Sequence, residues 1–200
     1  MSNTLKNKIA RIISTLFVPP SFTIIIFTFL AFYLETESIK IIVTLLVAYT
    51  LGFAAPIILF FFLRRKNLIV DSDASIKEER ALPFSIAIIF YLIGLVIFIY
   101  FDVNIISIAF WICYISNTII TIFINRYWKI SAHAMGAAGP FAAIVFLFGV
   151  SASYFLLLIV LIGWARIKLK CHTFGQVAAG TLLAFVSTYI QVYFITKYFS

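Results

Sequence analysis

The feature that most constrains this chain is a series of apolar runs, most of them near 20 residues long, separated by short polar segments. The hydrocarbon core of a bilayer is crossed by about 20 mostly apolar residues in a helix. Little of the chain lies outside such runs, and the composition agrees with this: 64% of its residues are hydrophobic and 11% are charged. Soluble domains carry about 25% charged residues. The sequence therefore predicts an integral membrane protein.

Backbone polar groups in lipid must pair within their own segment, so the apolar runs are expected to be α-helices. We predict an all-α, polytopic transmembrane bundle of six to seven helices, formed by one domain over residues 1–200. Pro19-Pro20 lies inside the first run and is expected to kink it. The two short runs around "GVSAS" are interpreted as two helices, since one helix of about 32 residues would exceed the bilayer. The predicted spans are 10–34, 41–63, 84–101, 104–125, 134–150, 152–165 and 174–196.

The Lys and Arg residues are divided very unequally between the two sides that seven spans define. Of the 15 residues, only Lys40 and Lys197 lie opposite the N-terminus. Basic residues accumulate on the cytoplasmic side of membrane proteins. We therefore expect a bacterial-type cytoplasmic membrane, with the basic face in the cytoplasm. Both histidines, His133 and His172, fall on this face.

Three polar clusters occur on the basic face, within "KEERALP", "SAHAMG" and "ARIKLKCHTFGQ". Arg and Lys side chains surround phosphate groups, and Arg binds them with two parallel N–H donors. A helix that begins at a Ser among small residues presents backbone N–H groups to the same anion. One neutral imidazole can attack phosphorus, and a second, protonated one can donate to the leaving oxygen. The residues of these types are Lys77, Arg80, Ser131, His133, Arg166 and His172.

The order of these residues resembles the type 2 phosphatidic-acid phosphatase superfamily, the membrane lipid phosphatases related to vanadium haloperoxidases. That family carries Lys, six residues and Arg-Pro; then Pro-Ser-Gly-His; then Ser-Arg, five residues, His, three residues and Asp. Here the third pattern runs from Ala165 to Gln176 and continues as "HTFGQVAAG". The second appears as "ISAH", and "KEERALP" supplies the residue types of the first without its spacing. The resemblance covers about half of the chain, from residue 77 to 180.

The resemblance implies an enzyme that hydrolyses lipid phosphates through a phosphohistidine, without a metal ion or other cofactor. His172 would be the nucleophile, and His133 the general acid that protonates the departing group. The substrate would be a lipid phosphate of the bilayer, of the phosphatidylglycerophosphate, phosphatidic acid, lipid A or polyprenyl (di)phosphate type, and no nucleic-acid partner is expected. The phosphate oxygens would be held by Lys77, Arg80, Ser131 and Arg166.

Gln176 departs from the family pattern, which has Asp at this position. That Asp orients the nucleophilic imidazole and supports its positive charge. The amide oxygen of Gln176 can still accept a hydrogen bond from the ring N–H of His172, but it brings no negative charge. We therefore expect slower chemistry or compensation by another carboxylate on this face. The candidates are Asp71, Asp73, Glu78 and Glu79.

Two other functions are compatible with the sequence. Asp71 and Asp73 form a carboxylate pair of the kind that holds Mg²⁺ in membrane prenyl-diphosphate transferases, although no second aspartate cluster follows. Gln176 favours instead a catalytically inactive protein that binds or transports a lipid phosphate. Sensitivity to EDTA distinguishes the transferase from the phosphatase, because a phosphohistidine mechanism does not depend on Mg²⁺.

Overall fold

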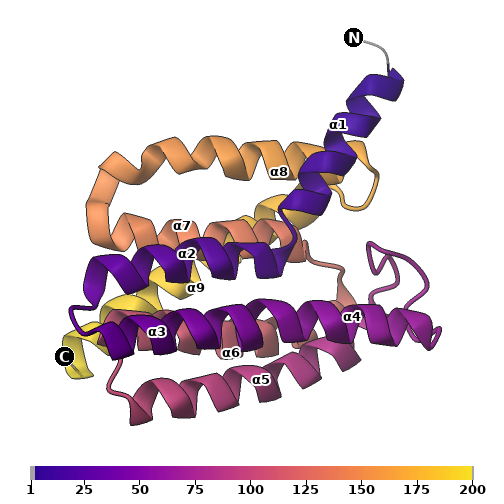
Figure 1. Cartoon of the computed structure of the whole chain (residues 1–200). Coiled ribbons are helices and arrows are strands. Elements are labelled where there is room, and N and C mark those ends of the chain that lie inside the picture. Colours follow the sequence, from indigo (N-terminus) through magenta and orange to yellow (C-terminus); the bar gives the residue numbers. More distant parts are fainter. Residues whose placement is uncertain (1–2, 200) are drawn as a thin grey trace.

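The computed structural model describes residues 3–199, and over these residues the protein is all-α (Figure 1). Each predicted span coincides with helical structure, and its ends agree to within about one turn except at the first span, whose helix begins at Asn3 rather than at residue 10, so the predicted helix bundle is confirmed. The helical elements are α1 (Asn3–Leu16), α2 (Pro19–Leu34), α3 (Ser38–Val47), the π-helix η1 (Ala48–Ala54), α4 (Ala55–Arg65), the short η2 (Glu78–Arg80), α5 (Ala81–Tyr100), α6 (Ile105–Tyr127), α7 (Ala132–Phe148), the 3₁₀ segment η3 (Gly149–Phe155), α8 (Leu156–Lys168) and α9 (Phe174–Phe199).

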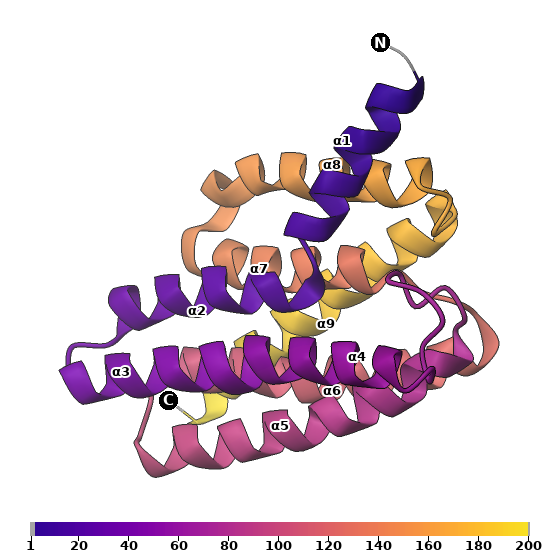
Figure 2. The same ribbon diagram turned by 45° about the vertical axis from the view of Figure 1, so that its right-hand side comes forward.

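The first two helices form a bent pair, with an angle of 54° between α1 and α2. α2 begins with Pro19 and Pro20, and proline is favourable there because the first N–H groups of a helix have no helical partner. The kink expected from this proline pair is therefore present. Before the kink, α1 stands apart from the axis of α2 and packs along α8 (Figure 1 and Figure 2). This packing places α1 at the end of the bundle where the polar clusters lie.

The run from Ala132 to Lys168 is helical throughout, but it folds back on itself as two arms, α7 and α8 (Figure 1). The turn starts at Gly149, whose φ of 61° lies in the left-handed region that favours glycine. α7 is 17 residues long, or about 25 Å, yet residues at its start and at the end of α8 contact the same residue, Ser14. The prediction of two separate helices here is confirmed.

Several helices are long and apolar enough to cross a membrane. Five meet this description within the described residues, or six if the bent pair α1–α2 counts as one span. One of the five is the Ala132–Lys168 run, and counting its two arms separately gives the seven segments expected from the sequence. These helices indicate an integral membrane protein.

The core of the bundle is built around Trp111 of α6, which is fully buried. Its ring makes an edge contact with Phe27, at 5.2 Å between centroids, and its Nε1 donates to the backbone oxygen of Tyr91 at 2.7 Å. Gly94 of α5 permits this packing, since a Cβ there would lie 2.5 Å from Trp111 Cζ2. Trp111 thereby fixes α2, α5 and α6 relative to one another.

The connections between helices gather at the two ends of the bundle (Figure 1). The α2–α3 and α5–α6 connections share one end, where Lys40 Nζ lies 3.0 Å from Asp102 Oδ2. The other end carries residues 66–77, 128–131 and 169–173. These segments flank or contain the three polar clusters. The clusters therefore meet at one end of the bundle, as the sequence predicts.

Candidate active site

His172 is held by Gln176, four residues later, at the start of α9. The Oε1 atom of Gln176 lies 3.1 Å from His172 Nδ1 and also accepts the backbone N–H of Thr173 at 3.1 Å. A backbone N–H only donates, so the amide oxygen must face both groups. Nδ1 of His172 therefore carries the ring proton, and Nε2 keeps its lone pair. The hydrogen bond expected between these two side chains is present.

The surroundings of His172 keep its imidazole neutral. The residue is 6% exposed and lies among cationic side chains. Burial lowers the pKa of His172 to about 3, and the positive charges of Arg80, Lys129 and Arg166 act in the same direction. A neutral imidazole with a free Nε2 is the form in which histidine acts as a nucleophile.

His133 enters the cluster from the first turn of α7. Ser131 caps this helix, since its Oγ accepts the backbone N–H of Ala134 at 3.4 Å. His133 Nε2 lies 3.2 Å from the backbone oxygen of Ser14. A carbonyl oxygen only accepts, so Nε2 carries a proton and donates it to α1. The structure thus gives the two histidines different protonated nitrogens.

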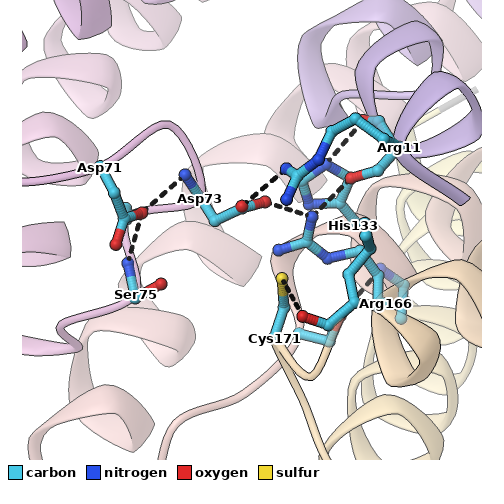
Figure 3. A network of polar contacts seen from close by, with 12 residues as sticks. Arg11, Asp71, Asp73, Ser75, His133, Arg166 and Cys171 are labelled. Carbon is cyan, nitrogen blue, oxygen red and sulfur yellow. Dashed lines mark hydrogen bonds and ion pairs between the residues drawn. The ribbon is translucent and has the colours of Figure 1, made fainter. Parts of the chain in front are cut away.

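Arg166, near the end of α8, is the most deeply buried cation of the cluster, with 1% of its surface exposed. Its Nη1 donates to Ser14 Oγ and, at 2.6 Å, to Asp73 Oδ1 (Figure 3). Its Nε has no hydrogen-bond partner within the described residues. A buried guanidinium with a spare donor is suited to an additional anionic oxygen.

Asp73 is the central anion of this cluster, although the sequence suggested for it only a supporting or metal-binding role. Its Oδ1 pairs with Arg166 and its Oδ2 with Arg11, at 2.6 and 2.8 Å (Figure 3). Burial raises the pKa of Asp73, but the hydrogen bonds from the two arginines outweigh it and lower the pKa to about 2. Asp73 is therefore ionised at any physiological pH.

Arg80 is buried and connects the loop before α5 to the α6–α7 segment. Its Nε donates to the backbone oxygen of Ala74 at 2.8 Å, and its Nη1 donates to that of Ile130 at 3.0 Å. Lys77 does not join this group, because its Nζ donates to the backbone oxygen of Arg126 at 2.6 Å. Of the two basic residues of "KEERALP", the structure therefore brings only Arg80 to the histidines.

Lys129 contributes a cation to His172 that the sequence offered only as an orientation signal. Its Nζ donates to the backbone oxygen of Cys171, next to His172, at 2.9 Å. Burial and the charges of Arg80 and Arg166 lower the pKa of Lys129. With Arg11, Lys129 is a member of the site that no local motif indicated.

The acidic side chains of this end do not supply His172 with the negative charge that Gln176 lacks. Glu79 accepts a backbone N–H at 3.0 Å, Glu78 lies 3.4 Å from its neighbouring lysine, and Asp71 accepts two backbone N–H groups of its own loop. Within residues 3–199, none of the acidic side chains is bonded to His172. No group of three or more potential metal ligands occurs in the same part of the chain.

A cavity of about 270 Å³ opens from this cluster into the bundle. Its polar end is lined by Asp73, Arg80, His133 and His172. Further in, α2, α4, α5, α6, α7 and α9 supply mostly apolar walls. Representative wall residues are Pro19, Pro56, Phe60, Phe84, Phe110 and Met135. The cavity therefore suits a molecule with an anionic head and an apolar tail.

Fold and site together define an integral membrane protein with a buried, cation-rich cluster around two histidines. Comparisons of the chain with protein-family models, with curated proteins and with solved structures found no match. The cluster can bind an anion between its arginines and can present it to an unprotonated imidazole nitrogen. This chemistry is suited to phosphoryl transfer.

Proposed function

We propose that the protein is a membrane hydrolase that removes phosphate from a lipid phosphomonoester or diphosphate through a phosphohistidine. The observation that carries this proposal is the cavity, which joins both histidines and Arg80 to apolar walls between the helices. A lipid phosphate fits this arrangement with its head at the cationic end and its tail among the helices. Soluble phosphate esters would leave the apolar walls without a ligand.

In this proposal the Nε2 atom of His172 attacks phosphorus while the bond to the lipid oxygen breaks. His133, doubly protonated while the anionic substrate is bound, supplies from Nδ1 the proton that the leaving oxygen takes up, and its Nε2 proton stays with the backbone oxygen of Ser14. Arg80 and Arg166 stabilise the charge that develops on the phosphoryl oxygens. Water then attacks the phosphohistidine and gives a proton to the vacated Nδ1 of His133, which releases phosphate, frees the imidazole of His172 and restores the general acid. Gln176 orients the ring of His172 but adds no negative charge, so we expect a slower reaction than a carboxylate would permit.

The test is phosphate release by the purified protein from a panel of lipids in nanodiscs. The panel holds phosphatidic acid, phosphatidylglycerophosphate, lipid A and polyprenyl mono- and diphosphates. We expect release from at least one of them, at the same rate with and without EDTA, because no step uses a metal ion. If no lipid of the panel releases phosphate, or if EDTA abolishes the release, the proposal is contradicted.

Gln176 is the one observation that favours a second function, the binding or transport of a lipid phosphate without hydrolysis. The same panel separates the two functions, since a binder takes up the lipids and releases no phosphate. A Mg²⁺-dependent transferase receives less support from the loop that suggested it. There, Asp73 is paired with two arginines, and Asp71 Oδ1 accepts backbone N–H groups.

We further propose that the cationic end of the bundle faces the cytoplasm, as the distribution of Lys and Arg favours. A single cysteine placed at the end of α8 by Lys168→Cys, in a chain without its two natural cysteines, tests this orientation. We expect an impermeant thiol reagent to label it in broken cells and to leave it unlabelled in intact ones. Labelling in intact cells would show that the cationic end of the bundle faces away from the cytoplasm, which would contradict this proposal.

A further inference from the structure

The carboxylate of Asp73 occupies the position between two guanidinium groups that an anionic ligand would otherwise take. Its two oxygens bridge Arg166 and Arg11, and its side chain is 13% exposed (Figure 3). Phosphate binds arginine in the same way, since two of its oxygens accept from separate N–H donors. Asp73 also lines the cavity beside His172.

The loop presents Asp73 by a defined turn. Asp71 Oδ1 accepts the backbone N–H groups of Asp73, at 2.8 Å, and of Ser75, at 3.2 Å. Ala74 has a φ of 44°, and its backbone oxygen accepts Nε of Arg80 at 2.8 Å. The carboxylate is therefore delivered to the arginines by its own chain, at a high effective concentration.

We propose that Asp73 is a specificity-determining residue that competes with the lipid headgroup for Arg11 and Arg166, so that only an anion of more than one charge displaces it. This inference rests on the proposed function and names the substrate class of the same site. It predicts phosphomonoesters and diphosphates as ligands, and it predicts rejection of phosphodiesters.

The physical basis is the charge of each competitor. A phosphomonoester carries about −1.5 to −2 at pH 7, with three terminal oxygens. A phosphodiester, the group found in most membrane phospholipids, carries one negative charge and two free oxygens, so it offers the arginines no more than the carboxylate does. Because Asp73 is already tethered, the diester loses this competition, whereas the dianion gains from the second charge. The spare Nε donor of Arg166 favours the additional oxygen in the same way.

The experiment measures the binding of monododecyl phosphate and of its methyl diester to detergent-solubilised protein, in a His172→Ala background that prevents turnover. The protein with Asp73 in place is expected to bind the monoester more tightly than the diester. Asp73→Asn keeps the size of the side chain and removes its charge. We expect it to strengthen binding of the diester by about tenfold or more and to bring the two affinities closer together.

Asp71→Asn is the matched control, because it removes a negative charge from the same loop but keeps an amide oxygen for the turn. It is expected to leave the ratio of the two affinities unchanged. Asp71→Ala provides a second test if Asp73→Asn does not fold, since loss of the turn should release Asp73 and lower the ratio in the same direction. An unchanged ratio in folded Asp73→Asn, or in Asp71→Ala when Asp73→Asn is unfolded, would overturn the inference.

Binding separates this inference from the proposed function. A ratio that shifts as expected in a protein that hydrolyses no lipid phosphate supports the role of Asp73 and rejects the enzyme. If the protein hydrolyses lipid phosphates but the ratio of monoester to diester affinity does not change in Asp73→Asn, the result supports the enzyme and rejects the role of Asp73.

Discussion

His172→Ala is expected to lower phosphate release from the best lipid substrate by about 10⁴-fold or more, the scale seen when a covalent nucleophile is removed. The second histidine, His133, is not expected to take over the attack, because its Nε2 is bonded to the backbone oxygen of Ser14 and its Nδ1 is the proposed proton donor to the leaving group. The measurement is initial-rate kinetics in nanodiscs. Thermal unfolding of the same samples shows that the variant is folded.

The companion variant His133→Ala separates the nucleophile from the general acid. Loss of a general acid lowers a rate by about 10²–10⁴-fold, and the loss shrinks when the leaving group needs no proton. An aryl phosphate with an acidic phenol should therefore restore much of the activity of His133→Ala but none of that of His172→Ala. Lys168→Ala serves as the control, since its Nζ donates to Asn3, outside the site. Activity that survives in His172→Ala, or rescue of both histidine variants, would contradict these assignments.

The second large effect is expected in stability, at the buried pair of Arg166 and Asp73. Arg166 Nη1 lies 2.6 Å from Asp73 Oδ1, and the two side chains are 1% and 13% exposed. Asp73→Asn leaves the buried cation of Arg166 without its counterion, which costs about 3–5 kcal/mol of unfolding free energy, whereas Arg166→Met leaves Asp73 paired with Arg11. Asp73→Asn should be destabilising by roughly that amount and Arg166→Met by less, and the double variant should lose clearly less than the sum.

Denaturant unfolding in mixed micelles measures this double-mutant cycle. The exposed pair of Lys40 and Asp102 is the matched control, because the carboxylate side chain there is 93% exposed and surface pairs couple weakly. We expect Lys40→Met and Asp102→Asn to be additive. Additive losses at Arg166 and Asp73 as well would show that the buried pair does not act as a unit. Inorganic phosphate should raise the unfolding free energy of Asp73→Asn more than that of the unaltered protein, because the anion replaces the lost counterion.

The helices were predictable from the sequence because each depends on local properties. An apolar run near the thickness of a bilayer has no other stable conformation in lipid. The Pro19-Pro20 kink follows from the backbone limits of proline, and the break near Gly149 was predicted because one helix of about 32 residues would exceed the bilayer. The π-helical segment η1 was not predicted, because no pattern in its sequence distinguishes it from an α-helix.

The candidate site was predictable only where its contacts are short in sequence. His172 and Gln176 are four residues apart, so the local turn that leads into α9 brings them together. The contacts of Arg166 with Ser14 and Asp73 span 152 and 93 residues, and they depend on how α1 and the loop before α5 fold back. Lys77 was expected at the site and instead binds a backbone oxygen at the end of α6. A basic residue in a polar loop has several acceptors within reach, and sequence does not rank them.

The central claim is a phosphoryl group carried by His172, and rapid quenching during turnover tests it most directly. The protein is mixed with a lipid phosphate labelled on phosphorus, quenched in alkali within the first turnover, digested and analysed by mass spectrometry. The account predicts an alkali-stable, acid-labile phosphoryl group on His172, absent from His172→Ala. Turnover without any phosphorylated residue, or a phosphoryl group on another side chain, would contradict it.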